Sequence, residues 1–163
     1  VATGIIGDKL FFKYVYEKGV AYRSWFYMTD RMGQSSIQNE MGVTPSNFAM
    51  ASSGVLGDVE GYQKTPPTPA DVKVAVDKAV SRHQLRSQEN RQLASRLAYW
   101  EMTGLGWEFG ETMPDKLRAV TPGQVSDVMK KYFRLDAYTR VAVGRDPGKV
   151  EAKPAGSTSK PAP

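Results

Sequence analysis

The chain contains no cysteine and only one histidine, His83, among its 163 residues. Without cysteine it can form no disulfide bond and offers no thiolate for catalysis. Zinc sites usually draw three or four ligands from histidine, cysteine and carboxylate side chains, so these two counts exclude the common zinc-binding sets. A serine nucleophile activated by histidine would depend on the same single residue. We therefore expect no metal site and no nucleophilic catalytic centre within this chain.

The sequence also lacks a long hydrophobic run and a clustered basic region. No apolar stretch reaches the ~18 residues of a transmembrane helix, so no membrane span is expected. The net charge of +5 comes from 22 basic and 17 acidic residues. Domains that bind nucleic acid usually carry a clustered basic face, and its absence predicts no nucleic-acid partner. No signal peptide is visible at Val1, and that residue is not methionine, so we expect a processed product or a fragment.

Hydrophobic periodicity predicts a helix and then a strand near the N-terminus. Apolar residues recur every fourth position over residues 5–16, which is typical of a helix with one buried face. Gly19 supplies the left-handed residue that commonly ends a helix. Residues 20–28 alternate and are rich in aromatic side chains, which predicts a strand. The alternation would put Tyr22 and Phe26 on the same face of that strand.

The next part of the sequence is interrupted by glycine and proline. Residues 29–46 are polar and predict a turn or a long loop that can continue the hairpin. Residues 47–56 predict a second strand, and residues 57–67 predict another loop.

Two helix starts carry recognisable capping chemistry. Residues 68–71, Thr-Pro-Ala-Asp, place a capping side chain before proline and a carboxylate in the first turn. A helical pattern then covers residues 70–103, either as one helix or as two helices broken near His83. A short helix is predicted over residues 114–120. Residues 121–124, Thr-Pro-Gly-Gln, form a second capping box that opens another helix.

The C-terminal part predicts one more strand and a tail. Residues 137–143 alternate and end at a glycine, as a strand does. Residues 146–163 are rich in proline, alanine and lysine and cannot bury enough apolar surface to order, so we expect a disordered tail. The predicted fold is therefore α+β, an antiparallel or mixed sheet flanked by helices on one side. We expect one domain, residues 1–145, followed by the tail.

Three segments together resemble a known family. FFKYVYEKGVAYRSWFYM, residues 11–28, is similar to the helix, turn and strand in the second half of insulinase-type (pitrilysin-like) zinc metallopeptidases, the family of mitochondrial processing peptidase. MPDKLRAVTPGQVSDVMKKYF, residues 113–133, with the following VAVG, is similar to the closing helix and strand of that family. TPADVKVAVDKAV, residues 68–80, stands where the family opens a long helix. The resemblance covers most of residues 4–145.

The resemblance implies a role in holding substrate. In this family the zinc motif H-x-x-E-H lies in the first half of a clamshell, whereas the second half contacts the peptide. The motif is absent here, so zinc would be expected on another domain or subunit. In active relatives a tyrosine and an arginine seven residues before it contact the peptide near the scissile bond. Tyr22 matches that tyrosine, whereas Val15 occupies the arginine position; Lys13, Lys18 and Arg23 are the nearest cations in the sequence.

The chain also departs from the family in length. A strand and a helix should precede Val1, and a helix should lie between a strand near Phe48 and Thr68. The resemblance therefore implies either a truncated chain or a trimmed fold.

Several functional hypotheses follow from these observations. The first is a non-catalytic C-terminal half-domain that holds peptide substrate through Tyr22, opposite a zinc-bearing partner, in the periplasm or another extracytoplasmic compartment. The second is an inactive scaffold or assembly module with no proteolytic role, which Val15 favours; Tyr22 would then only pack a sheet. A third is a binder of anionic surfaces through the four arginines between Arg82 and Arg96. His83 lies on an apolar helical face and is expected to be structural.

Overall fold

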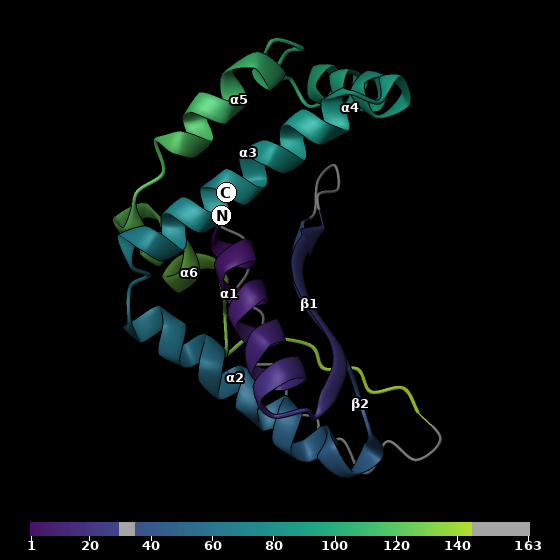
Figure 1. The fold of residues 1–163 in the computed structure, drawn as a ribbon, viewed down its shortest axis with the longest axis vertical. Coiled ribbons are helices and arrows are strands. Elements are labelled where there is room, and N and C mark those ends of the chain that lie inside the picture. Colours follow the sequence, from purple (N-terminus) through teal and green to yellow (C-terminus); the bar gives the residue numbers. More distant parts are fainter. Residues whose placement is uncertain (30–34, 145–163) are drawn as a thin grey trace, which may run out of the picture.

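In the computed structural model, which describes residues 1–29 and 35–144, the fold consists of six α-helices and a β-hairpin that lies at one side of them (Figure 1). The elements in chain order are α1 (Ala2–Phe11), the π-helical turn η1 (Phe12–Glu17), β1 (Ala21–Thr29), β2 (Ser36–Val43), the 3-10 turn η2 (Pro45–Asn47), α2 (Phe48–Lys64), α3 (Pro69–Ser87), α4 (Asn90–Met102), α5 (Phe109–Arg118) and α6 (Pro122–Tyr132). Strands β1 and β2 pair antiparallel, so the expected α+β class is confirmed. No helix within the described residues is long and apolar enough to cross a membrane.

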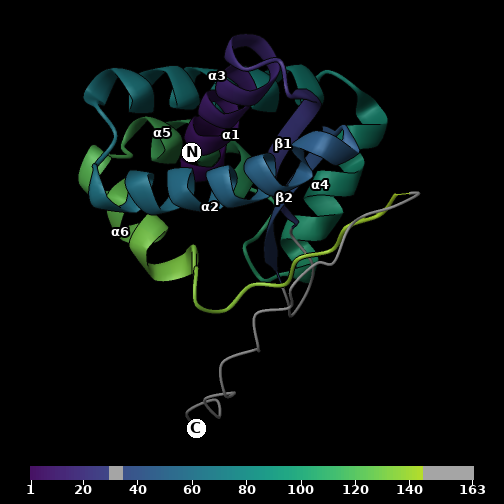
Figure 2. The ribbon, with the colours of Figure 1, turned by 90° about the horizontal axis from the view of Figure 1, so that it is seen from below.

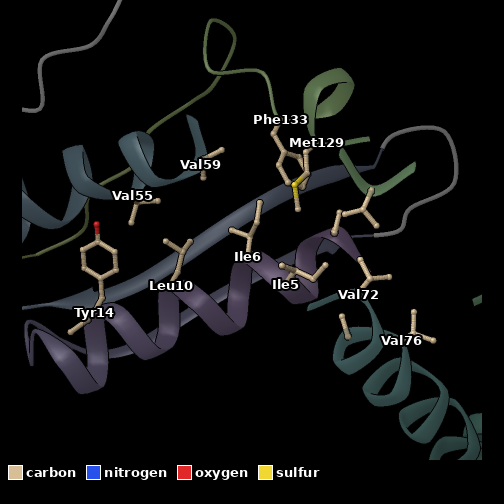
Figure 3. Close-up of a cluster of buried hydrophobic side chains, with 14 of the residues drawn as sticks. Ile5, Ile6, Leu10, Tyr14, Val55, Val59, Val72, Val76, Met129 and Phe133 are labelled. Carbon is tan, nitrogen blue, oxygen red and sulfur yellow. The ribbon is translucent and has the colours of Figure 1, made fainter. Parts of the chain in front are cut away.

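Helix α1 is the centre of the fold. It lies between α2 and α3 in both orientations of the ribbon (Figures 1 and 2). Ile6, Leu10 and Tyr14 have no exposed surface and line up along one side of the helix. The buried cluster gathers side chains from four helical regions (Figure 3): Ile5, Ile6, Leu10 and Tyr14 with Val55, Val59, Val72, Val76, Met129 and Phe133.

Gly7 lets α1 lie directly on strand β1. A Cβ atom at this position would stand 3.2 Å from the carbonyl oxygen of Phe26. A glycine inside a helix costs about 1 kcal/mol relative to alanine, and the close approach of the two backbones explains why one is placed here. The side chain of Phe26 points into the core and packs edge-on against Phe133, with 5.6 Å between the ring centroids.

The predicted N-terminal helix and strand are confirmed. The helix expected over residues 5–16 begins earlier, at Ala2, and its last turn widens into η1, which ends at Glu17. Gly19 has a φ of 59°, the left-handed conformation that its position after the helix predicted. The strand expected over residues 20–28 is β1.

The region expected to be strand and loop is instead a hairpin strand and a helix. Residues 36–43, within the segment expected to be a turn or loop, form β2. Residues 48–64 form α2, so the strand predicted over 47–56 is wrong, as is most of the loop predicted over 57–67. Ala51, Val55 and Val59 recur every fourth residue and are all buried, which is the helical signal that three interspersed glycines obscured.

One of these glycines is required by packing. A Cβ atom on Gly54 would stand 2.3 Å from the hydroxyl of Tyr14, so only glycine allows the phenol to reach α2. The Tyr14 hydroxyl donates a 2.9 Å hydrogen bond to Asp58, and Lys13 forms an ion pair with the same carboxylate. The family resemblance implied a helix before Thr68 that the sequence pattern did not show. Helix α2 occupies that place.

Both predicted capping boxes are present. The Thr68 hydroxyl accepts from the backbone of Asp71, and the Asp71 carboxylate accepts from the backbone of Thr68. Thr121 and Gln124 make the same reciprocal pair at the start of α6. Residues 70–103 form two helices, with the break at residues 88–89 rather than at His83.

Two predictions near the C-terminus are corrected. The short helix expected over residues 114–120 begins earlier, at Phe109, because Phe109 and Gly110 pack against Trp100 and hold the turn before Pro114. The strand expected over residues 137–143 makes no ladder with any other described residue. The predicted tail over residues 146–163 lies outside the described residues.

Leucine at position 7 should separate α1 from β1. We expect Gly7→Leu to lower the free energy of unfolding by about 1–3 kcal/mol, because the side chain has no room over Phe26. Gly4→Leu is the matched control, since no atom lies within 4 Å of a Cβ atom there. It should be neutral or stabilising by up to ~1 kcal/mol. Urea unfolding of both variants checks this, and equal losses of stability would contradict the packing described.

Tyr14 should make stability depend on alkaline pH. Burial, and then the Asp58 carboxylate, raise the pKa of Tyr14 above its usual value; the pKa of Tyr62 is raised by burial and by Asp58 as well. Because the folded-state pKa is the higher one, the contribution of neutral Tyr14 is complete below about pH 10 and is lost as the pH rises further.

The test compares urea unfolding at neutral and alkaline pH. Tyr14→Phe should lower stability by about 1–2 kcal/mol at neutral pH through loss of the Asp58 hydrogen bond. It should also make the alkaline decline shallower, with Tyr62 responsible for part of what remains. Tyr16→Phe is the control, because that ring is 68% exposed. An alkaline decline as steep in Tyr14→Phe as in the parent chain would refute this role.

Candidate functional site

Tyr22 is the extra residue of a β-bulge. Ala21 pairs with Val43 and Arg23 pairs with Gly42, so two consecutive residues of β2 face three of β1. Bulges redirect side chains and are common beside functional sites. The shift breaks the predicted alternation, and Tyr22 does not share the inward face of Phe26. Its side chain is 71% exposed.

The ring of Tyr22 lies over Gly42 on the outer face of the hairpin. A Cβ atom on Gly42 would stand 2.2 Å from the Cζ atom of Tyr22, so this placement requires glycine. Glycine within a strand often marks such a close approach. The sequence contained this signal, but it could not be connected to Tyr22 without the strand register.

Arg23 flanks the ring and is itself held in place. Its guanidinium lies 5.6 Å from the ring centroid of Tyr22 and 5.3 Å from that of Trp25. Its Nη2 donates a 2.6 Å hydrogen bond to Glu40 on β2. The Nε atom of Arg23 is buried and finds no acceptor among the described residues. Tyr22, Arg23, Trp25, Glu40 and Gly42 are called the Tyr22 surface below.

The residue at the expected arginine position cannot serve this surface. Val15 is half-buried in η1 and packs against the core. Lys13 is paired with Asp58, and Lys18 lies over the ring of Tyr14, 5.2 Å from its centroid. Three cations, Lys13, Lys18 and Arg23, were expected near Tyr22. The described contacts place Arg23 against the Tyr22 ring.

The Tyr22 surface offers a phenol hydroxyl, a guanidinium and two partly exposed aromatic rings on a paired strand. The Arg23–Glu40 ion pair is too exposed to add more than about 1 kcal/mol of stability, so its main effect is to orient the guanidinium. Hydroxyl and guanidinium donors suit the carbonyl oxygens of a peptide, and aromatic rings suit its side chains.

His83 has a structural environment. Its ring stacks on Trp100 with 6.3 Å between the centroids, and Nδ1 makes a hydrogen bond with Arg96. Burial, and then the charge of Arg96, lower the pKa of His83. Among the described residues, no three histidine, cysteine, aspartate or glutamate side chains come together as a metal site would need.

The arginines near His83 do not form one uniform charged face. Arg96 is half-buried, with its guanidinium 4.7 Å from the ring centroid of Trp100. Arg86 and Arg91 line a shallow hollow together with Arg96, beside Glu89. Part of the arginine group expected at the surface thus supports the packing of α3 on α4.

Two solved structures have folds similar to that of this chain. The peptidase M16 inactive domain from Pseudomonas fluorescens matches with a TM-score of 0.70 and 14% sequence identity over 82% of this chain. A protease from Helicobacter pylori matches with a TM-score of 0.65 and 12% identity, also over 82% of this chain. The chain has the fold of an M16 inactive domain. M16 is the peptidase class of the insulinase-type enzymes, so the resemblance found in the sequence is confirmed for the fold.

The M16 match covers part of larger proteins. This chain spans about a third of the length of the two solved structures, 34% and 35%. No model of a known protein family matches the chain, and neither does any curated protein. The M16 inactive-domain fold is thus established by structure, at a sequence identity that shows the fold alone.

Alanine at position 42 should displace the Tyr22 ring. In Gly42→Ala the new methyl group takes the space under the phenol, and the exposed ring can rotate away. We expect changed NMR shifts for the Tyr22 ring and a stability change of less than about 1 kcal/mol. Gly57→Ala, where a Cβ atom meets nothing within 4 Å, should leave those shifts unchanged. Unaltered Tyr22 resonances in Gly42→Ala would show that the ring does not lie on Gly42.

Proposed function

We propose that this chain is a non-catalytic C-terminal half-domain of an insulinase-type zinc metallopeptidase and holds peptide substrate opposite a zinc site on another domain or subunit. The proposal rests on the M16 inactive-domain fold together with the outward position of Tyr22, which matches the substrate tyrosine of the family. The single observation that carries it is the bulge that turns Tyr22 away from the core.

The Tyr22 surface would act on the peptide rather than on the attacking water. Zinc on the partner would activate that water, as it does in metallopeptidases. The Tyr22 hydroxyl can donate to a carbonyl oxygen of the bound peptide, and such a donor is most valuable where negative charge develops in the transition state. Arg23 lies against Tyr22 and can contribute positive charge at the same surface, although from a different sequence position than the family's arginine.

Val15 supports a second candidate, an inactive peptidase-like scaffold. Val15 stands where active relatives have the arginine that completes the substrate pair, and its side chain packs against the core instead of reaching the Tyr22 surface. Under this alternative the M16 inactive-domain fold would serve assembly with a partner, and Tyr22 would have no part in proteolysis. Both candidates share the same expected partner, a zinc-bearing subunit or domain of the family, and the same proposed extracytoplasmic location.

A reconstituted cleavage assay separates the two candidates. The chain is mixed with a zinc-bearing insulinase-type subunit from the same organism, and peptide cleavage is followed. We expect the parent chain to raise kcat/KM, and Tyr22→Phe to lower it about 10-fold to 100-fold through loss of one donor. Tyr16→Phe, which also alters an exposed tyrosine, should have no effect.

The same assay can also exclude a role of Tyr22 in holding substrate. If the chain leaves cleavage unchanged, or if Tyr22→Phe is as active as the parent, substrate holding is wrong and the scaffold role stands. Loss of activity in both tyrosine variants would indicate a general effect on folding, which circular dichroism of the two proteins would detect.

A further inference from the structure

A shallow hollow lies where helices α3 and α4 meet. It has a volume of about 410 Å³, which is within the range of about 300–1,000 Å³ that is common for small-molecule sites. The residues that line it are Arg86 from the last turn of α3, Glu89 from the connecting turn, and Arg91, Gln92, Ser95 and Arg96 from α4. None of them belongs to the Tyr22 surface, so the hollow is separate from the site described above.

The hollow carries a surplus of positive charge. Three of its lining residues are arginines, whereas Glu89 is the one acidic residue among them. The Glu89 carboxylate accepts a hydrogen bond from the side-chain amide of Gln92. Within residues 1–29 and 35–144, it forms no ion pair with an arginine. The charges of the arginines are therefore not balanced by the protein itself.

Arg86 and Arg91 have guanidinium groups that are available to a ligand. Both residues are exposed, and neither side chain has a hydrogen bond or an ion pair with any other described residue. Arg86 comes from α3 and Arg91 from α4. An anion in the hollow can therefore be held from two helices at once.

Arg96 adds positive charge from a fixed position. Its Nη1 donates 3.3 Å hydrogen bonds to the carbonyl oxygen of His83 and to the hydroxyl of Ser87, and neither of these partners carries negative charge. Burial, and then the charge of Arg86, lower the pKa of Arg96, so the two guanidinium groups are close enough to repel each other. An anion in the hollow would offset this repulsion.

The first turn of α4 adds backbone donors at the same end of the helix. Glu89 is the N-cap residue, but its side chain makes no capping hydrogen bond. The backbone amides of Asn90, Arg91 and Gln92 find no acceptor among the residues that the structure describes. Free amides and the positive end of a helix dipole both favour a negative group nearby.

We propose that this hollow binds the phosphate group of a small phosphorylated molecule. The oxygens of a phosphate form a tetrahedron and can accept hydrogen bonds from guanidinium groups that approach from several directions, whereas a carboxylate offers two oxygens in one plane. Arg86 and Arg91 bind the phosphate oxygens directly, since arginine is well suited to this geometry. Arg96 and the first turn of α4 add positive potential. This site does not depend on the proposed role in holding peptide.

The test is a titration of the full chain with inorganic phosphate, followed by NMR at about pH 7.5, where phosphate is largely a dianion. His83 is the only histidine in the chain, and its ring is bonded to Arg96, so its resonances report on the hollow. We expect them to shift saturably, with half-saturation at about 1 mM. At the same ionic strength, the monoester glycerol 2-phosphate should bind similarly, and the dicarboxylate malonate at least ~5-fold more weakly.

Charge variants locate the bound phosphate. Arg86→Gln and Arg91→Gln should each weaken binding at least ~5-fold through loss of a charge-assisted hydrogen bond. Arg82→Gln is the matched control: it removes the same charge from an exposed position of α3 outside the hollow, and should change binding less than ~2-fold. Glu89→Gln should tighten binding at least ~3-fold by removing the acidic side chain from the hollow, a gain that misfolding cannot produce.

Several results would overturn the proposal. One is a titration that does not saturate below about 20 mM phosphate. Others are malonate binding as tight as that of phosphate, failure of glycerol 2-phosphate to bind, and no gain of affinity in Glu89→Gln. Equal weakening by Arg82→Gln and Arg86→Gln would also contradict a site in the hollow, because it would indicate attraction to the net charge of the chain alone.

Discussion

The contact between helix α1 and strand β1 at Gly7 positions the rest of the structure. With the two backbones this close, Ile6 and Leu10 become fully buried, and the helix is enclosed by α2 and α3. Complete burial of side chains of this kind contributes about 1.5–3 kcal/mol each. No other helix has its apolar side so completely covered, among the residues that the structure describes.

The same contact sets the position of the candidate site. Helix α1 continues through η1 to Tyr14, whose hydroxyl reaches Asp58 on α2, and Gly19 then turns the chain into β1. The hairpin thus has one face committed to the core and one face free. The bulge puts Tyr22 on the free face, where Gly42 gives the ring room and Arg23 flanks it. A strand paired with β2, rather than a loop, carries the residue proposed to touch the peptide.

Local signals in the sequence predicted the parts of the fold that depend on local chemistry. The N-terminal helix, its glycine stop, strand β1 and both capping boxes follow from spacing and turn residues. Helix α2 could not be predicted, because its glycines lower helix propensity and Gly54 is explained only by Tyr14, forty residues away in the sequence. The bulge at Tyr22 depends on the register with β2, which no single strand encodes. Residues 137–143 have a strand pattern, but a strand forms only where a neighbour supplies the hydrogen bonds.

Photo-crosslinking from position 22 can show whether Tyr22 touches the bound peptide. Tyr22 is replaced by p-benzoylphenylalanine, the chain is assembled with its zinc-bearing partner, and the complex is irradiated in the presence of a slowly cleaved peptide substrate. We expect a crosslink between residue 22 and the peptide, and none from the same group at Tyr16. A complex that crosslinks to the partner but never to the peptide at position 22 would contradict it and leave the scaffold role.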